Sequence, residues 1–281
     1  MTAHEHHHHG HDNHGGHQHG AGLAETLTLD SRILGSYLEQ ATALAAELAA
    51  TVPATIIDLG AGTGVGTVAL AQRFENAGIV ALDKSADMLE QTRQAARGQG
   101  LGSRVTTVQA DLDAAWPAVA AADLIWASSS LHELADPERT MRDMFANLTA
   151  GGLLMVIEMD SLPRFLPGGS ELSGMESRLH VALAQQHWNQ HPDWKAGLAR
   201  SGFDVIEQWS ITTVASSTPD LTARYARLFL ERIRTALAGV ADPADLTALD
   251  TVLATHGPDS LDHRTDLVVS GSRTVWAARK P

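Results

Sequence analysis

One stretch of the chain reads Ile56-Ile57-Asp58-Leu59-Gly60-Ala61-Gly62-Thr63-Gly64-Val65-Gly66. With Thr55 before it, the apolar part is rich in β-branched residues, which is typical of a buried parallel strand. The glycines that follow predict a turn that lets a ligand approach the backbone, because glycine lacks a Cβ and adopts positive φ. Residues 67–74 predict a helix, whose N-terminus offers unpaired N–H groups. The stretch therefore predicts a nucleotide-type pocket.

The spacing of these glycines separates two classes of nucleotide site. A dinucleotide fingerprint has the form G-x-G-x-x-G. Counted from Gly60, the third position falls on Val65, and counted from Gly62 it falls on Thr67. Neither register fits, which argues against a nicotinamide-dependent reductase on the same kind of sheet.

Further strands are predicted along the chain. They are short apolar runs, over residues 78–83, 105–109, 124–127, 153–158 and 203–213, with a last pairing supplied by 267–269 and 274–278. Helical spacing of apolar residues predicts helices between them, including 31–50, 175–190 and 221–254. The run over 78–83 ends in Asp83, where a carboxylate can accept hydrogen bonds from both hydroxyls of a ribose.

Length and composition limit the function further. The chain has 281 residues, 33 acidic against 20 basic side chains, a formal charge of −13 and no cysteine. Disulfides and thiolate sites are excluded, and the acidic balance disfavours nucleic acid as a partner. No apolar run is long enough to predict a membrane span or a secretory signal. We therefore expect a cytoplasmic protein that associates with neither membrane nor nucleic acid.

The pattern Asp-x-Gly-x-Gly-x-Gly that starts at Asp58, followed by Asp83 and Asp111, resembles the class I S-adenosylmethionine-dependent methyltransferases. The resemblance covers roughly residues 51–203 and the terminal strand. It implies an α/β fold with a Rossmann-like seven-stranded sheet, six strands parallel and the last antiparallel, under a helical cap. It also implies S-adenosyl-L-methionine as cofactor, held at the carboxyl ends of the first four strands.

The resemblance implies a set of cofactor-binding residues. They are Asp58, Gly60, Ala61, Gly62, Gly64, Asp83, Lys84, Met88, Asp111, Leu112 and Ser128. Asp58 would meet the methionyl ammonium directly or through water, Met88 would pack on the adenine, and Asp111 would accept from the adenine amino group. Two alternatives stay open: Met88 as core filler, and Asp111 as the cap of a helix over 112–115.

The methyl-acceptor side is less defined. The Leu131-His132 pair after the fourth strand resembles a family position near the acceptor, so His132 is the general-base candidate, with a scaffold role as the alternative. Strand ends and the enlarged segment before the sixth strand supply further candidate substrate contacts: Glu133, Glu158, Arg164 and Trp188. We expect O- or N-methylation of a small molecule. The alternative is a methyltransferase-like protein that binds cofactor or metal without transferring methyl.

The N-terminus is low in complexity and rich in histidine. We expect residues 1–22 to form a disordered tail. We expect residues 23–281 to form one methyltransferase domain whose cap helices occupy approximately 23–50, 160–200 and 217–262. Imidazole groups bind divalent transition metals, so the tail is a candidate metal site through His6, His7, His8, His9 and His11.

Overall fold

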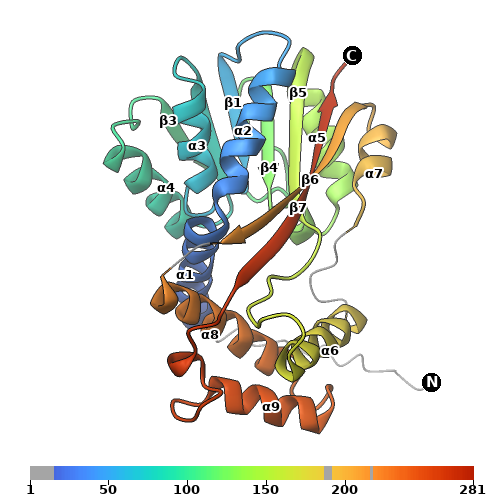
Figure 1. Cartoon of the computed structure of the whole chain (residues 1–281). Coiled ribbons are helices and arrows are strands. Elements are labelled where there is room, and N and C mark those ends of the chain that lie inside the picture. Colours follow the sequence, from blue (N-terminus) through green and yellow to red (C-terminus); the bar gives the residue numbers. More distant parts are fainter. Residues whose placement is uncertain (1–15, 187–191, 216–217) are drawn as a thin grey trace, which may run out of the picture.

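The computed structural model describes residues 16–186, 192–215 and 218–281, and it is built around a seven-stranded sheet (Figure 1). The strands are β1 Thr55–Leu59, β2 Gly78–Asp83, β3 Val105–Gln109, β4 Ala122–Ser128, β5 Leu148–Met159, β6 Asp204–Ala215 and β7 Val269–Arg279. Their order is β3-β2-β1-β4-β5-β7-β6. Only β7 runs antiparallel to its neighbours, β5 and β6. The predicted sheet, six strands parallel and the last antiparallel, is confirmed.

The helices of the described part fall into sheet-covering and cap groups. They are α1 Gly16–Leu34, α2 Ser36–Leu48, α3 Val65–Arg73, α4 Ala86–Gly98, α5 Pro137–Asn147, α6 Glu171–Gln185, α7 Lys195–Arg200, α8 Pro219–Ala236 and α9 Pro243–Leu253, with 3₁₀ turns η1 Leu131–Glu133 and η2 Leu261–His263. α2 and α3 contribute to the core on one face of the sheet, and α5 and α7 to the core on the other. None of the described helices is long and apolar enough to cross a membrane.

Local sequence explains where several helices begin. Ser85 caps α4, its side chain accepting a hydrogen bond from the Met88 N–H at 3.3 Å. Asp136 caps α5 in the same way through the Arg139 N–H at 2.9 Å, and Pro137 occupies the first turn. Such caps satisfy N–H groups that the helix itself cannot pair. α4 thereby begins directly after the end of β2, whereas η1 separates α5 from the end of β4.

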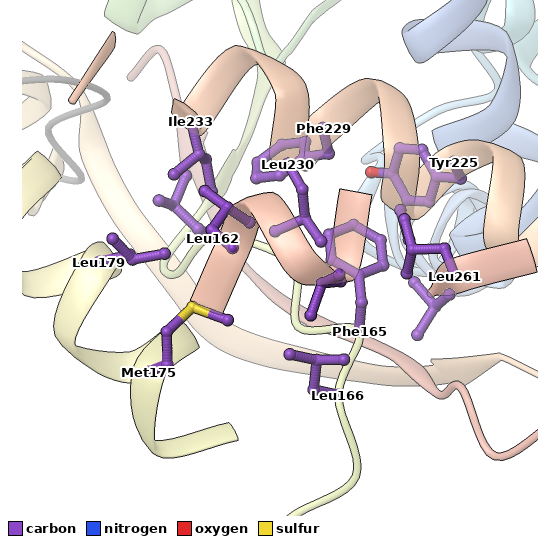
Figure 2. Close-up of a cluster of buried hydrophobic side chains, with 14 of the residues drawn as sticks. Leu162, Phe165, Leu166, Met175, Leu179, Tyr225, Phe229, Leu230, Ile233 and Leu261 are labelled. Atoms are coloured by element: carbon purple, nitrogen blue, oxygen red, sulfur yellow. The ribbon is translucent and has the colours of Figure 1, made fainter. Parts of the chain in front are cut away.

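The cap stands at the carboxyl edge of the sheet and has its own core. α1, α6, α8 and α9 pack their apolar faces around the segment 162–166. Figure 2 shows Phe165 of that segment against Tyr225 and Phe229 of α8, with ring centroids 5.2 and 5.5 Å apart. The cap is therefore a packed layer with an apolar core of its own, which Val269 at the start of β7 joins to the sheet.

Three boundaries differ from the sequence expectations. The predicted helix 31–50 is two helices that meet at Gly35, and only α1 lies in the cap, while α2 and α7 cover the sheet. α1 begins at Gly16, so residues 16–22 are helical and the predicted disordered tail is too long; a helix nucleated by packing at its far end extends cheaply. β7 runs unbroken through residues 270–273, because main-chain pairing with β6 does not require apolar side chains.

Candidate active site

A cavity of about 310 Å³ opens between the carboxyl edge of the sheet and the cap. The strand order reverses between β1 and β4, and ligands bind at such switch points in open α/β sheets. The cavity wall contains many of the residues that the sequence singled out: Gly60, Gly62, Asp83, Lys84, Met88, Asp111, Leu112, His132 and Glu133. The structure thus brings together residues from four strand ends.

The glycine turn has three positive φ angles with different causes. Gly60, Gly62 and Gly64 have φ of 70, 54 and 85°. A Cβ on Gly60 would lie 2.5 Å from Cβ of Ser130, and one on Gly64 would lie 2.7 Å from Cα of Thr92 in α4. At Gly62 the nearest atom would be 3.9 Å away. Gly62 therefore faces open space, whereas Gly64 allows α3 and α4 to approach and does not line the cavity.

Asp83 joins this turn to the end of β2. Its Oδ2 accepts from the Gly62 N–H at 2.9 Å, and its Oδ1 accepts from the Ser85 N–H at 2.8 Å. A carboxylate has about four lone-pair positions, so each oxygen keeps one for a ligand. The carboxylate both holds the turn and faces the cavity.

Asp58 and Ala61 lie behind the turn. The Asp58 side chain is 3% exposed, and its Oδ2 accepts from Thr67 Oγ1 at 2.5 Å. Burial raises the pKa of Asp58 to about 6, although the Thr67 hydrogen bond lowers it. Ala61 donates its N–H to the Leu82 carbonyl. Neither residue lines the cavity, which argues against direct contact between Asp58 and a ligand ammonium; contact through water stays a prediction.

The segment after β4 exposes different serines from the one predicted. Ser128 Oγ lies 3.4 Å from the Tyr37 hydroxyl, away from the cavity, whereas Ser129 and Ser130 line it. Ser129 has φ of 52°, which is unusual for a residue other than glycine. The strained backbone turns the chain sharply at the strand end, so that the serines after Ser128 reach the cavity in its place.

Glu158 holds the backbone of the segment that follows β4. The side chain is buried, and Oε1 accepts from the N–H groups of Ser130 and Leu131 at 3.0 and 2.8 Å. Oε2 lies 2.7 Å from Nδ1 of His132. Glu158 does not line the cavity, so its predicted role as a substrate contact is corrected to that of a positioning residue.

His132 lies between two carboxylates. Its Nε2 is 3.3 Å from Glu133 Oε1, opposite the Glu158 contact. Burial lowers the pKa of His132, but the hydrogen bonds to Glu133 and Glu158 outweigh burial and raise the pKa to about 10. An imidazolium with both N–H groups engaged cannot accept a proton. The electrostatics therefore favour the scaffold role over the general base.

The remaining predicted residues divide into three groups. Asp111 lines the cavity and also accepts from the Asp113 N–H at 3.0 Å, which closes a turn and not the helix considered for 112–115. Arg164 is exposed on the segment before α6, where it donates to Ser177, and it does not reach the cavity. Trp188 and the tail histidines lie outside the described residues. Within 16–186, 192–215 and 218–281, no cluster of three or more metal-ligating side chains occurs.

The cap and β7 supply cavity residues that the sequence did not indicate: Asp30, Tyr225, Arg232 and Arg273. Asp30 Oδ2 lies 2.5 Å from Arg273 Nη2, and its Oδ1 accepts from the Tyr225 hydroxyl at 2.8 Å. β7 is antiparallel, so its early residues stand at the carboxyl edge of the parallel strands, with Arg273 opposite Met159. Arg273 lies in the polar first half of β7, among Ser270, Ser272 and Thr274, so the strand pattern carried no signal for it.

Comparison with known sequences identifies the central region. Residues 56–152 match the family described as a methyltransferase domain. Trans-aconitate 2-methyltransferase from Azoarcus sp. (strain BH72) is 35% identical over 133 residues, 46% of this chain and 50% of that protein. Malonyl-[acyl-carrier protein] O-methyltransferase from Laribacter hongkongensis is 30% identical over 158 residues, 54% of this chain and 51% of that protein. The chain spans about half the length of the curated relatives it matches.

Comparison with solved structures supports the fold. The YcgJ protein from Bacillus subtilis superposes with a TM-score of 0.53 at 15% identity, covering 86% of this chain and 98% of that one. The BH2331 protein from Bacillus halodurans C-125 gives a TM-score of 0.54 at 17% identity, covering 85% and 98%.

Proposed function

We propose that this chain is a class I S-adenosylmethionine-dependent methyltransferase, because residues 56–152 match a methyltransferase domain. In this proposal it transfers a methyl group from S-adenosylmethionine to a small-molecule acceptor, by O- or N-methylation. One observation carries the proposal: the glycine turn, Asp83 and Asp111 come from three strand ends and face one cavity. A cavity of about 310 Å³ is within the range of small-molecule sites.

The described residues fit such a cofactor. Gly62 leaves the backbone open, and each oxygen of Asp83 keeps a lone pair for a ribose hydroxyl. Met88 and Leu112 provide apolar surface and Asp111 an acceptor for an adenine. S-adenosylmethionine supplies an electrophilic methyl group on a positively charged sulfur. We assign Gly60, Lys84 and Ser129 to the same half of the cavity.

The protein contributes orientation and exclusion of water to this reaction. Holding donor and acceptor in line accounts for much of the rate of such transfers. Glu158 holds the segment around Ser130 and His132, and the cap closes the cavity from the opposite side. We propose His132 as a positioning group, with Glu133 as its partner at the cavity surface.

A transfer assay tests the proposal. The protein is incubated with S-adenosylmethionine and a panel of metabolites, and formation of S-adenosylhomocysteine and methylated product is followed by mass spectrometry. The acceptors named for the relatives, trans-aconitate and malonyl-acyl-carrier protein, belong in the first panel. Product from any small acceptor supports the proposal. Binding of cofactor without turnover across a wide panel would favour the alternative of a scaffold that does not transfer methyl.

Two further expectations remain proposals. We propose the cytoplasm as the location of the protein. We also propose that His6, His7, His8, His9 and His11 bind divalent metal, since dense imidazoles do so. Removal of residues 1–15 is expected to abolish retention on immobilised Ni²⁺ and to leave affinity for S-adenosylhomocysteine unchanged.

A further inference from the structure

Arg273 is a buried cation in the cavity wall, on β7 and not on the strands that carry the predicted cofactor residues. Its side chain is 3% exposed, and its guanidinium carbon lies 4.0 Å above the ring of Tyr37. Nη2 donates to Asp30, while Nε is buried and has no hydrogen-bond partner among the described residues. A buried polar group without a partner costs free energy, so this guanidinium retains unused donor capacity.

Asp30 does not pair with that Nε. Its Oδ1 accepts from the Tyr225 hydroxyl and its Oδ2 from Nη2 of Arg273. The Asp30 and Tyr225 contacts hold the guanidinium against the cavity from α1 and α8. Its position is therefore fixed by residues from three distant parts of the chain, which is the arrangement expected of a recognition group.

The cavity wall carries charges of both signs, with Lys84 next to Asp83 at one end and Asp30 next to Arg273 at the other. Asp83, Asp111 and Asp113 stand at the ends of β2 and β3, where the cofactor is proposed to bind. Arg273 on β7 and Arg232 on α8 stand at the cap end, and the Arg232 side chain is on the exposed side of its helix. The cap end thus presents two guanidinium groups, the side chains best suited to a carboxylate.

We propose that the methyl acceptor carries a carboxylate, which Arg273 and Arg232 bind at the cap end of the cavity. This assignment rests on the proposed function, because it needs a second ligand beside the cofactor. It makes Arg273 and Arg232 specificity-determining residues, with Asp30 and Tyr225 as positioning residues for Arg273. A neutral acceptor of the same shape would leave the buried Arg273 guanidinium with unsatisfied donors and is disfavoured by that cost.

Calorimetry on protein saturated with S-adenosylhomocysteine tests the inference. Malonate, succinate and tricarballylate are titrated, each against the amide of the same carbon frame. At least one acid is expected to bind at least tenfold more tightly than its amide. Arg232→Gln is expected to weaken that binding by about tenfold or more, the range for hydrogen bonds to charged groups. Arg273→Lys keeps the charge but loses the planar fork, and a similar loss is expected.

The controls separate this inference from the proposed function. Arg234→Gln makes the same charge change on the same helix, at a residue that pairs with Asp250 outside the cavity, and it should leave acid binding unchanged. If Arg273→Lys fails to fold, the inference is tested by Arg232→Gln alone, because Arg232 is exposed. Two results would overturn the inference alone, provided that S-adenosylhomocysteine still binds. One is that no acid binds more tightly than its amide, and the other is that Arg232→Gln and the wild type bind the acid equally. Failure of the wild type to bind S-adenosylhomocysteine would overturn both.

Discussion

The carboxylate of Asp83 accepts a hydrogen bond from the backbone N–H of Gly62, at 2.9 Å between Oδ2 and N. This bond ties the end of β2 to the turn after β1, two segments that are 21 positions apart in the chain. The second oxygen accepts from the Ser85 N–H, at the start of α4. One side chain therefore shapes the cavity in addition to facing it.

Replacing Asp83 is expected to affect both stability and ligand affinity. Asp83→Ala leaves the Gly62 and Ser85 N–H groups without their acceptor, and we expect a loss of about 1–3 kcal/mol in the free energy of unfolding. The sequence alone indicates no protein partner for this carboxylate. Affinity for S-adenosylhomocysteine should fall by about 1.5–3 kcal/mol, measured by calorimetry, and Asp83→Asn should lose less. Wild-type affinity in both variants would remove Asp83 from the ribose site.

The three glycines of the turn should differ in their tolerance of alanine. Gly62→Ala meets only the cost of positive φ, about 1–2 kcal/mol, because nothing lies closer than 3.9 Å to the new Cβ. Gly64→Ala should lose a further 1–3 kcal/mol, roughly, from overpacking against the Thr92 backbone at 2.7 Å. Urea unfolding measures both. Equal stability of the two variants would show that the packing of α3 on α4 does not depend on Gly64.

The raised pKa of His132 has a consequence for stability at alkaline pH. With a folded pKa of about 10 against an ordinary 6.5, the protonated ring stabilises the fold fully below pH 6.5, and this contribution is lost as the pH rises through about 10. The stability difference between wild type and His132→Gln should therefore shrink by about 1–3 kcal/mol from pH 6 to pH 10. A difference that stays constant would mean that the ring is neutral, and the general-base role would return.

Glu176 should act in the same direction over a lower range of pH. Its Oε1 accepts from the Phe165 N–H at 2.8 Å inside the cap core, and burial raises its pKa to about 7, although the Phe165 and Leu166 hydrogen bonds lower it. The folded state binds the proton more tightly than the unfolded state, so stability falls as the pH rises from about 4.5 to about 7, on the order of 3 kcal/mol. Glu176→Gln should remove this part of the pH dependence. Identical pH profiles for the two proteins would contradict the burial of an ionisable carboxyl at this position.

The strands and the cofactor-side residues were predictable because their signals are local. β1, β2 and β3 are apolar or alternating runs bounded by turns, and they lie at the predicted residues. Gly60, Gly62 and Asp83 follow directly from strand ends, which meet at one edge in any parallel sheet. Short-range pattern was sufficient for the half of the cavity that the sheet provides.

The acceptor half could not be predicted from local pattern. Asp30 and Arg273 are 243 positions apart, and their pairing depends on the antiparallel course of β7 and on α1 packing under α8. Glu158 and Ser128 were placed in the cavity because they end strands, but the direction of a strand-end side chain depends on register and on the backbone turn at Ser129. The directions of these side chains depend on tertiary geometry, which a short stretch of sequence does not reveal.

The central claim is that this cavity binds S-adenosylmethionine and not a dinucleotide. Isothermal titration of the full chain with S-adenosylhomocysteine and with NADH tests it most directly. We predict micromolar binding of S-adenosylhomocysteine and no comparable affinity for NADH. Tight binding of NADH with no heat from S-adenosylhomocysteine would contradict the account.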